Sequence, residues 1–333
     1  MKIVTFGEIM LRLSTPGFAR FSQTKNFNAT YGGGEANVAM SLSLMGFEAE
    51  HITRFPDNDL GKAATQMLHQ YGLKTENIVF GGDRLGIYFL ETGAISRPSK
   101  VVYDRAGSSF SSLNPKDFNW DKILEGADWF HFTGISPAIS QEAANACHDA
   151  LDAANAKGVK VSFDVTYRKN LWQYGKTAQQ VFPDLAAKSD LLFCSKGDMK
   201  EMFSIQAPED EKFVQVCQRT MALFPRVGKI VNSKRESNSA SDNTISGVIF
   251  NGTEQFSSPK HKLFPIVDRI GGGDAFCAGL IYGQLVYKND EQSINCAVAA
   301  SALKHSIEGD FNQATVEEIE TVMRGDSSGK LSR

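Results

Sequence analysis

Short apolar segments alternate with longer amphipathic ones along most of this chain. The apolar segments are rich in β-branched and aromatic side chains, so we expect buried strands at Lys2–Phe6, Glu50–Phe55, Trp129–Thr133, Val159–Val165, Leu191–Cys194 and Lys229–Asn232. The amphipathic segments between them predict helices at Ala36–Met45, Gly61–Gln70, Gln141–Ala156 and Phe213–Leu223. This alternation is typical of an α/β fold in which a doubly wound, mostly parallel sheet carries helices on both faces.

Two regions interrupt the alternation. Residues 9–31 and 84–112 have strand character with no helix between the strands, and they predict a small β sheet that stands off the main domain as a lid. In the second region Val101, Tyr103 and Arg105 are expected to share one face, because side chains alternate along a strand. We expect one α/β domain over residues 1–323 and a flexible tail over 324–333.

Composition excludes several classes of function. The 333 residues carry a net charge of −3, so there is no basic surface to hold nucleic acid or an anionic membrane. No apolar run of about 18 residues predicts a membrane-spanning helix. The five cysteines are scattered without a CxxC pair, and the six histidines are dispersed, which favours free thiols in the cytoplasm and no permanently bound metal.

Three consecutive glycines open the most informative segment, VDRIGGGDAFCAGLIYGQL (267–285). Gly271, Gly272 and Gly273 stand where a helix is expected to begin, and no packing requirement visible in the sequence calls for three of them. A glycine-only helix start lets an anion approach unpaired N–H groups at the positive end of the helix dipole. Asp274 follows directly. It could merely complement the dipole, but beside the glycines it predicts a general base that takes a proton from a hydroxyl group.

Other nucleotide-binding patterns are absent or incomplete. A phosphate-binding loop of the G-x-x-x-x-G-K-[ST] type fails because residue 170 is Asn. The protein-kinase signatures do not occur. No G-x-G-x-x-G follows the first strand, which disfavours a dehydrogenase.

Two motifs make the chain resemble the PfkB, or ribokinase-like, carbohydrate kinases over nearly its whole length. They are YGGGEANVAMSLSLMG (31–46) and DRIGGGDAFCAG (268–279). The resemblance implies a ribokinase-like fold with a β lid, an anion hole at Gly271–Gly273 and a catalytic base at Asp274. Within the family the chain is most similar to the 2-keto-3-deoxygluconate kinases, through FGEIMLRLS, GIYFLE, VVYDRAGSS, FDVTYRKNLW and VDRIGGGDAF.

That resemblance implies a set of contacts to a sugar acid: Gly34, Tyr88, Tyr103, Arg105, Ile135, Arg168 and Asp310. The residue chemistry agrees, since a substrate carboxylate calls for a guanidinium group. Arg168 also follows a predicted strand at its carboxyl end, where open α/β sheets bind ligands. Each arginine could instead form a surface ion pair, and each tyrosine could simply cover the sheet. For Glu8 and Arg12 we expect salt bridges.

The chain departs from the family pattern in two places that concern the nucleotide. The usual N-x-x-E motif, which helps to organise Mg²⁺, is replaced by Ser195-Lys196-Gly197-Asp198. The usual glycine-rich loop is replaced by SKRESNSASDNTISG (233–247), which is either an exposed loop or part of the nucleotide site through Ser233, Lys234 and Arg235. Mg²⁺ is often held through substrate phosphates and water, so a smaller protein share is tolerable.

The resemblance therefore implies a cytoplasmic kinase that transfers the γ-phosphoryl group of ATP, with Mg²⁺ and optionally a monovalent cation, to the terminal hydroxyl of a six-carbon keto acid. Its partners would be a sugar acid, a nucleotide and further copies of itself bound through the lid. A kinase for a neutral sugar such as fructose or ribose is the main alternative. A non-catalytic sugar-binding protein on the same fold is the other.

Overall fold

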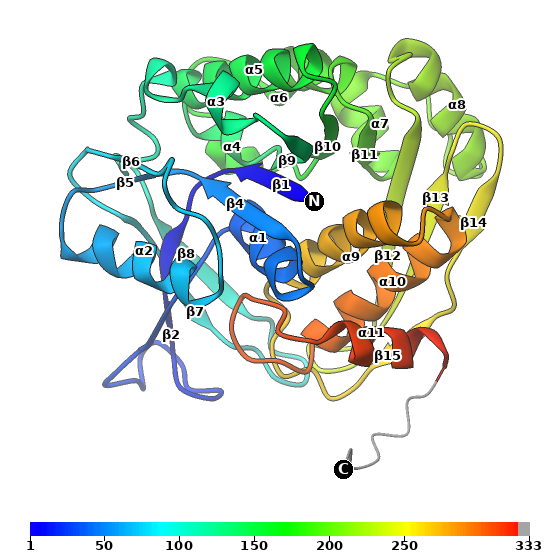
Figure 1. Cartoon of the computed structure of the whole chain (residues 1–333). Helices are drawn as coiled ribbons and strands as arrows, with labels where there is room; N and C mark the ends of the chain where they lie inside the picture. Colours follow the sequence, from blue (N-terminus) through cyan, green and yellow to red (C-terminus); the bar gives the residue numbers. More distant parts are fainter. Residues whose placement is uncertain (326–333) are drawn as a thin grey trace.

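The predicted strands assemble into one large mixed sheet in the computed structural model, which describes residues 1–325 (Figure 1). Six strands run parallel in the order β12-β11-β10-β9-β1-β4. Their bounds are β1 Lys2–Phe6, β4 Glu48–Ile52, β9 Ala127–Thr133, β10 Lys160–Asp164, β11 Leu191–Phe193 and β12 Lys229–Ser237. Three strands beyond β12 join antiparallel: β13 Asn243–Phe250, β14 Gln255–Ser257 and β15 His261–Leu263. The predicted doubly wound α/β architecture is confirmed.

Helices cover both faces of this sheet (Figure 1). One face carries α3 Trp120–Ile123, α5 Gln141–Ala156, α6 Ala178–Ala187, α7 Lys196–Phe203 and α8 Phe213–Leu223. The other face carries α1 Gly34–Leu44, α9 Gly272–Val286 and α10 Asp290–Lys304, with α11 Val316–Met323 packed on α10. Short helical turns, η1 Pro115–Asp117, α4 Ser136–Ile139 and η2 Lys169–Leu171, fill connections after strands.

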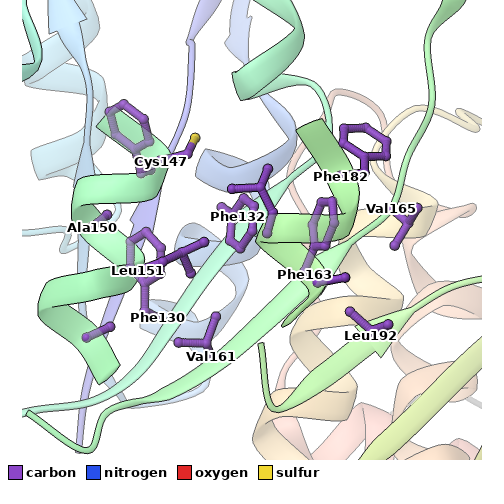
Figure 2. Close-up of a cluster of buried hydrophobic side chains, with 14 of the residues drawn as sticks. Phe130, Phe132, Cys147, Ala150, Leu151, Val161, Phe163, Val165, Phe182 and Leu192 are labelled. Atoms are coloured by element: carbon purple, nitrogen blue, oxygen red, sulfur yellow. The ribbon is translucent and has the colours of Figure 1, made fainter. Parts of the chain in front are cut away.

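The hydrophobic core on the α5 side is built from apolar side chains of the central strands and of the helices that cover them (Figure 2). Phe132 of β9 and Phe163 of β10 stack with ring centroids 4.6 Å apart. Cys147 and Leu151 of α5 pack on the same layer and are fully buried. β9 and β10 are covered on both faces, and each large apolar side chain buried there stabilises the fold by about 1.5–3 kcal/mol. The polar side chains of His131 and Ser162 on these strands are also buried, and they lie within hydrogen-bond distance of each other.

A second sheet of four strands, in the order β3-β2-β7-β8, is built from the two regions that interrupt the β–α alternation. The strands are β2 Met10–Ser14, β3 Asn28–Gly32, β7 Gly86–Glu91 and β8 Lys100–Asp104. We call it the lid sheet. It lies beside α2 Asp59–Gln70 and the small pair β5 Arg54–Phe55 and β6 Val79–Phe80. Every residue of β8 is exposed, so this strand forms an uncovered edge of the lid sheet.

The structure confirms one local prediction, the cap of α5, and decides another, the segment 233–247. Ser140 caps α5 as predicted, with its Oγ accepting a hydrogen bond from Ala143 N at 3.1 Å. The polar segment 233–247 is not a loop: β12 continues to Ser237 and pairs with β13, so the segment forms most of a β hairpin. No helix within residues 1–325 is long and apolar enough to cross a membrane. Residues 326–333 of the predicted flexible tail lie outside the described residues.

Candidate active site

Two cavities meet at the start of α9. The lid cavity, about 320 Å³, lies between the lid sheet and the carboxyl ends of the parallel strands; its lining includes Glu8, Gly34, Tyr88, Tyr103, Arg105, Ile135, Arg235, Arg269, Gly271, Asp274 and Asp310. The strand-end cavity, about 280 Å³, is lined by Phe193, Cys194, Ser195, Asp198, Val231, Asn232, Ser233, Phe276 and Cys277, among others. Asp164, Thr166, Arg168 and Gly273 line both. A group held at Gly273 can therefore face a ligand in each cavity.

Of the three glycines at the start of α9, two have neighbours that leave no room for a side chain and one does not. Gly271 adopts φ +79°, and a Cβ atom there would lie 1.9 Å from the carbonyl oxygen of Asp310. A Cβ on Gly272 would lie 2.5 Å from Cε1 of His305. Only Gly273 faces open space, with nothing within 4 Å. The expectation that packing has no need of these glycines is thus wrong for two of the three, because the turn after α10 presses against the helix start.

The amide groups at this helix start are nonetheless available to a ligand. The first hydrogen bond of the turn runs from Ala275 N to Gly271 O at 2.8 Å. Within residues 1–325 no acceptor engages the N–H groups of Gly272, Gly273 or Asp274. Such unpaired donors at the positive end of a helix suit an anion.

Asp274 lies in the wall of the lid cavity, one residue beyond Gly273. Its Oδ2 accepts a hydrogen bond from Asn37 Nδ2 at 2.6 Å, which orients the carboxyl group. Desolvation raises the pKa of Asp274 to about 7, and the charge of Asp164 adds to the effect. A carboxyl group with this pKa accepts a proton from a nearby hydroxyl more readily than an ordinary, fully exposed aspartate.

The glycines before α1 repeat the arrangement on the opposite wall. A Cβ on Gly32 would strike the carboxylate of Asp310, and one on Gly33 would lie 2.1 Å from Glu8 O. A Cβ on Gly34 would meet Asp274 Oδ1 at an ordinary contact distance of 3.6 Å. Gly34 therefore lies next to the candidate base, and a larger side chain there would intrude on the space in front of it.

Tyr103 lies on β8, and Arg105 is the residue that follows this strand. Both line the lid cavity, as the alternation of side chains predicts. The guanidinium of Arg105 lies 5.9 Å from the ring centroid of Tyr103. It also forms an ion pair with Glu8, which is buried and accepts a second hydrogen bond from Ser108 Oγ. The salt bridge expected for Glu8 is thus present, and it involves one of the two arginines predicted to bind substrate.

Asp310 lines the lid cavity but is already engaged by the protein. Arg12 Nη1 lies 2.6 Å from Asp310 Oδ1, and Tyr88 donates its hydroxyl hydrogen to Asp310 Oδ2. The other Arg12 nitrogen, Nη2, lies 2.6 Å from Asp268 Oδ2. All four side chains are buried, so this network links the lid strands β2 and β7 to the segments flanking α9 and α10. The salt bridge expected for Arg12 is present.

Arg168 and Ile135 come from turns that follow β10 and β9. Arg168 lines both cavities, is exposed, and forms no ion pair within residues 1–325; its Nη1 donates to Tyr167 O at 3.1 Å. Ile135 contributes an apolar contact at the start of α4. Of the two predicted carboxylate-binding arginines, Arg168 is the one with no ion-pair partner in the described part of the chain.

Of the three residues predicted to bind the nucleotide, one lines the strand-end cavity. Ser233 lines it, whereas Lys234 lines neither cavity and lies 3.5 Å from Glu236 Oε1 on the opposite side of β12. Arg235 lines the lid cavity instead. Ser195 and Asp198 form a reciprocal cap at the start of α7, with Asp198 Oδ2 2.8 Å from Ser195 N.

Three residues in these cavities escaped the sequence analysis. Asp164 lines both cavities at the end of β10, and desolvation raises its pKa to about 6. Its position at the carboxyl end of a predicted parallel strand was an available signal. Asn37, which orients Asp274, had no comparable signal, because only the folded chain brings it to Asp274. Arg269, which lines the lid cavity, lies two residues before Gly271 in the motif 268–279, and that proximity was an available signal.

Comparison with known proteins agrees with this geometry. The model of the pfkB family of carbohydrate kinases matches residues 1–313. The crystal structure of 2-dehydro-3-deoxygluconokinase from Thermotoga maritima is 44% identical, covers 98% of each chain and has a TM-score of 0.93. A PfkB family carbohydrate kinase from Listeria grayi is 32% identical over 97% of this chain and 100% of its own, with a TM-score of 0.92. A 2-dehydro-3-deoxygalactonokinase from Haloferax volcanii is 28% identical over 98% of each chain.

Proposed function

This chain belongs to the pfkB family of carbohydrate kinases, and from that premise we propose that it transfers the γ-phosphoryl group of ATP to the terminal hydroxyl of 2-keto-3-deoxygluconate, giving the 6-phosphate. It is a phosphotransferase that acts on a hydroxyl group. The observation that carries the proposal is the junction of two cavities at Gly273, with a carboxyl group of raised pKa beside it. The sugar acid would occupy the lid cavity and the nucleotide the strand-end cavity.

The proton chemistry belongs to Asp274. Its carboxylate would take the hydroxyl proton of the acceptor as that oxygen bonds to phosphorus and the bond to the leaving ADP breaks. The N–H groups of Gly272 and Gly273 would bind the charge that develops on the phosphoryl oxygens, and Asn37 would keep the base oriented. Lid closure over the sugar would exclude water and so limit ATP hydrolysis.

The remaining predicted contacts divide between the substrates. Arg168 and Arg105 would hold the carboxylate, with Tyr103 beside them; Gly34, Tyr88, Ile135 and Asp310 would complete the sugar site. Ser233 would contact the nucleotide from β12. Lys234 lines neither cavity and pairs with Glu236, so we assign it no role at the nucleotide.

The donor set of the strand-end cavity fits Mg²⁺, the metal of this chemistry. Asp164 and Asp198 are carboxylates that line this cavity, and the charge of Asp198 contributes to the raised pKa of Asp164. Oxygen ligands of this kind would hold Mg²⁺ together with the nucleotide phosphates, where it neutralises their charge. A monovalent cation, which the family resemblance allows, stays part of the proposal without an assigned residue.

We expect Arg168→Met to lower kcat/KM for 2-keto-3-deoxygluconate by about 10–100-fold, because a charge-assisted hydrogen bond contributes about 1.5–3 kcal/mol. Activity with fructose or ribose, if measurable, should change little, since those sugars carry no carboxylate. A coupled ADP-release assay over 2-keto-3-deoxygluconate, 2-keto-3-deoxygalactonate, gluconate, fructose and ribose measures both effects.

Arg168→Lys is the matched control, because it keeps the charge but loses the planar pair of donors. Its kcat/KM for 2-keto-3-deoxygluconate should lie between those of the wild type and Arg168→Met. If a neutral sugar is the best substrate of the wild type, the chain is instead a kinase for neutral sugars. The ion pair between Arg105 and Glu8 favours this alternative, because it leaves only one of the two predicted carboxylate-binding arginines, Arg168, without an ion pair in residues 1–325.

The lid sheet is proposed to join copies of the chain in the cytoplasm. Its edge strand exposes Val102 at 52% and Tyr103 at 56%, and all five cysteines, which lie within residues 1–325, are free and buried, as suits a reducing compartment. We expect sedimentation velocity to give about twice the chain mass of 36.5 kDa, and Val102→Glu to shift the protein toward monomer. A wild-type monomer at micromolar concentration would refute lid-mediated association.

A further inference from the structure

Two arginines without an ion pair in residues 1–325 line the lid cavity at the start of α9. Arg235 comes from β12 and Arg269 from the segment before the helix, and both line the lid cavity with Gly271 and Gly273. A Cβ on Gly272 would lie 3.3 Å from Arg235 Nη2, so this guanidinium lies against the helix start. Arg12 and Arg105 pair with carboxylates, whereas neither Arg235 nor Arg269 forms an ion pair within residues 1–325.

His305 determines where Arg235 points. Its Nδ1 lies 2.6 Å from Ser301 O, and because a carbonyl oxygen only accepts hydrogen bonds, Nδ1 must carry the proton. The lone pair of Nε2 is then free to accept from Arg235 Nη2 at 2.9 Å. Burial lowers the pKa of His305 to about 4, so the ring is neutral at physiological pH and keeps this acceptor. His305 thus tethers a long, flexible side chain in one orientation.

The arrangement concentrates positive charge at one point. Arg235 and Arg269 carry like charge in the same cavity and so repel each other. Desolvation, and then the charge of Arg269, lower the pKa of Arg235. Arg269 Nε is also buried without a hydrogen-bond partner. The unpaired amides of α9 face the same region. Such repulsion is relieved by an anion with several oxygens, and planar guanidinium groups match phosphoryl oxygens well.

We propose that Arg235 and Arg269 clamp the phosphoryl group while it moves between the two cavities, and that His305 is a positioning residue for this clamp. The inference rests on the proposed kinase function and deepens it. The acceptor oxygen bonds to phosphorus, the bond to the β-phosphate oxygen of ATP breaks, and the hydroxyl proton goes to Asp274. Both arginines stay protonated throughout and bind charge only. Arg235, expected from the sequence at the nucleotide, is thereby assigned to the transferred group.

The test is a set of variants assayed on whichever sugar the wild type phosphorylates best. Arg235→Met and Arg269→Met should each lower kcat by about 10²–10³-fold, as loss of one transition-state donor does, while KM for ATP and sugar changes little. Arg235→Lys, which keeps the positive charge, should lower kcat less than Arg235→Met does. A rise in KM for ATP with kcat unchanged would overturn the clamp and return Arg235 to the nucleotide.

A double-mutant cycle tests His305 separately. His305→Leu removes the acceptor and should lower kcat about tenfold in the wild-type background but have almost no effect beside Arg235→Met, since interacting residues are not additive. His305→Gln, whose Oε1 can accept the same hydrogen bond, should restore most activity. Equal losses in both backgrounds would make His305 merely structural and refute its positioning role. A wild type that phosphorylates no sugar would instead refute the proposed function itself.

Discussion

Replacing Asp274 by Asn is expected to lower kcat by about 10²–10⁴-fold, the range that general-base catalysis contributes. The two side chains have nearly the same shape, and an amide oxygen can still accept the hydrogen bond from Asn37. Binding of sugar and nucleotide should therefore persist. Coupled ADP release measures turnover, and titration calorimetry measures binding in the same preparation. Wild-type activity in the variant would remove Asp274 from its role as base.

Asp164→Asn is the matched control, because Asp164 also lines the lid cavity and also has a raised pKa. If Asp164 acts through Mg²⁺ as proposed, its variant should need more Mg²⁺ for half-maximal rate. If kcat at saturating Mg²⁺ falls further in Asp164→Asn than in Asp274→Asn, then Asp164 would be the general base and Asp274 the residue that acts through Mg²⁺.

The pH dependence follows from the pKa of about 7 for Asp274. The base acts when ionised, so kcat/KM of the wild type should fall tenfold per unit as pH drops below about 7. Stability has the opposite sign. A carboxyl whose pKa is higher in the folded state binds its proton more tightly there, so burying it costs stability as pH rises from about 4 to 7. Asp274→Asn should accordingly melt at a higher temperature than wild type at pH 8, with the difference vanishing in acid.

Arg12→Met is expected to cost about 3–5 kcal/mol in the free energy of unfolding, because removing one partner of a buried ion pair leaves charge uncompensated. Two carboxylates depend on Arg12, those of Asp268 and Asp310, each 2.6 Å from one guanidinium nitrogen. Arg12 is 3% exposed. Without Arg12 the Asp310 carboxyl group, whose pKa is raised by burial and lowered by Arg12, would bind its proton more tightly in the folded state, so the loss should be largest at neutral pH and should shrink as pH falls. Denaturant unfolding at pH 8 and pH 5 measures this.

Arg84→Met provides the comparison for that measurement. Arg84 pairs with Asp104 at 2.8 Å, but their side chains are 36% and 53% exposed. Water screens such a pair, so its loss should cost less than about 1 kcal/mol. Similar losses in the two variants would mean that burial of the Arg12 network contributes nothing beyond an ordinary surface ion pair.

The helices and central strands were predictable because their signals are local. Helix α5 has the predicted bounds, Gln141–Ala156, since Ser140 supplies a cap and the apolar side chains recur at helical spacing. Strands β9 and β10 carry phenylalanine and valine side chains because both faces are covered. The sequence left the segment 233–247 open between an exposed loop and part of the nucleotide site. Its polar composition resembles a loop, whereas the pairing of β12 with β13 supplies the backbone hydrogen bonds that make most of it a β hairpin.

The site was predicted in part, and sometimes for the wrong reason. The glycine run marked the helix start correctly, yet Gly271 and Gly272 are required by Asp310 and His305, residues more than 30 positions away in the chain. The alternation of side chains along β8 correctly put Tyr103 and Arg105 on one face. It could not reveal that Glu8 already neutralises Arg105.

Sequence alone determined the α/β class, the helix that begins at the glycines, and the carboxylate that follows them, because periodicity, capping and backbone freedom depend on neighbouring residues. Only the tertiary structure decided which charges are free to act. Arg105 and Asp310 form ion pairs with partners from distant strands, while Arg168, Arg235 and Arg269 form none among residues 1–325. The physical reason is that Coulomb interactions and desolvation depend on distance and burial in space, which are established only when the lid sheet, β12 and the turn after α10 come together.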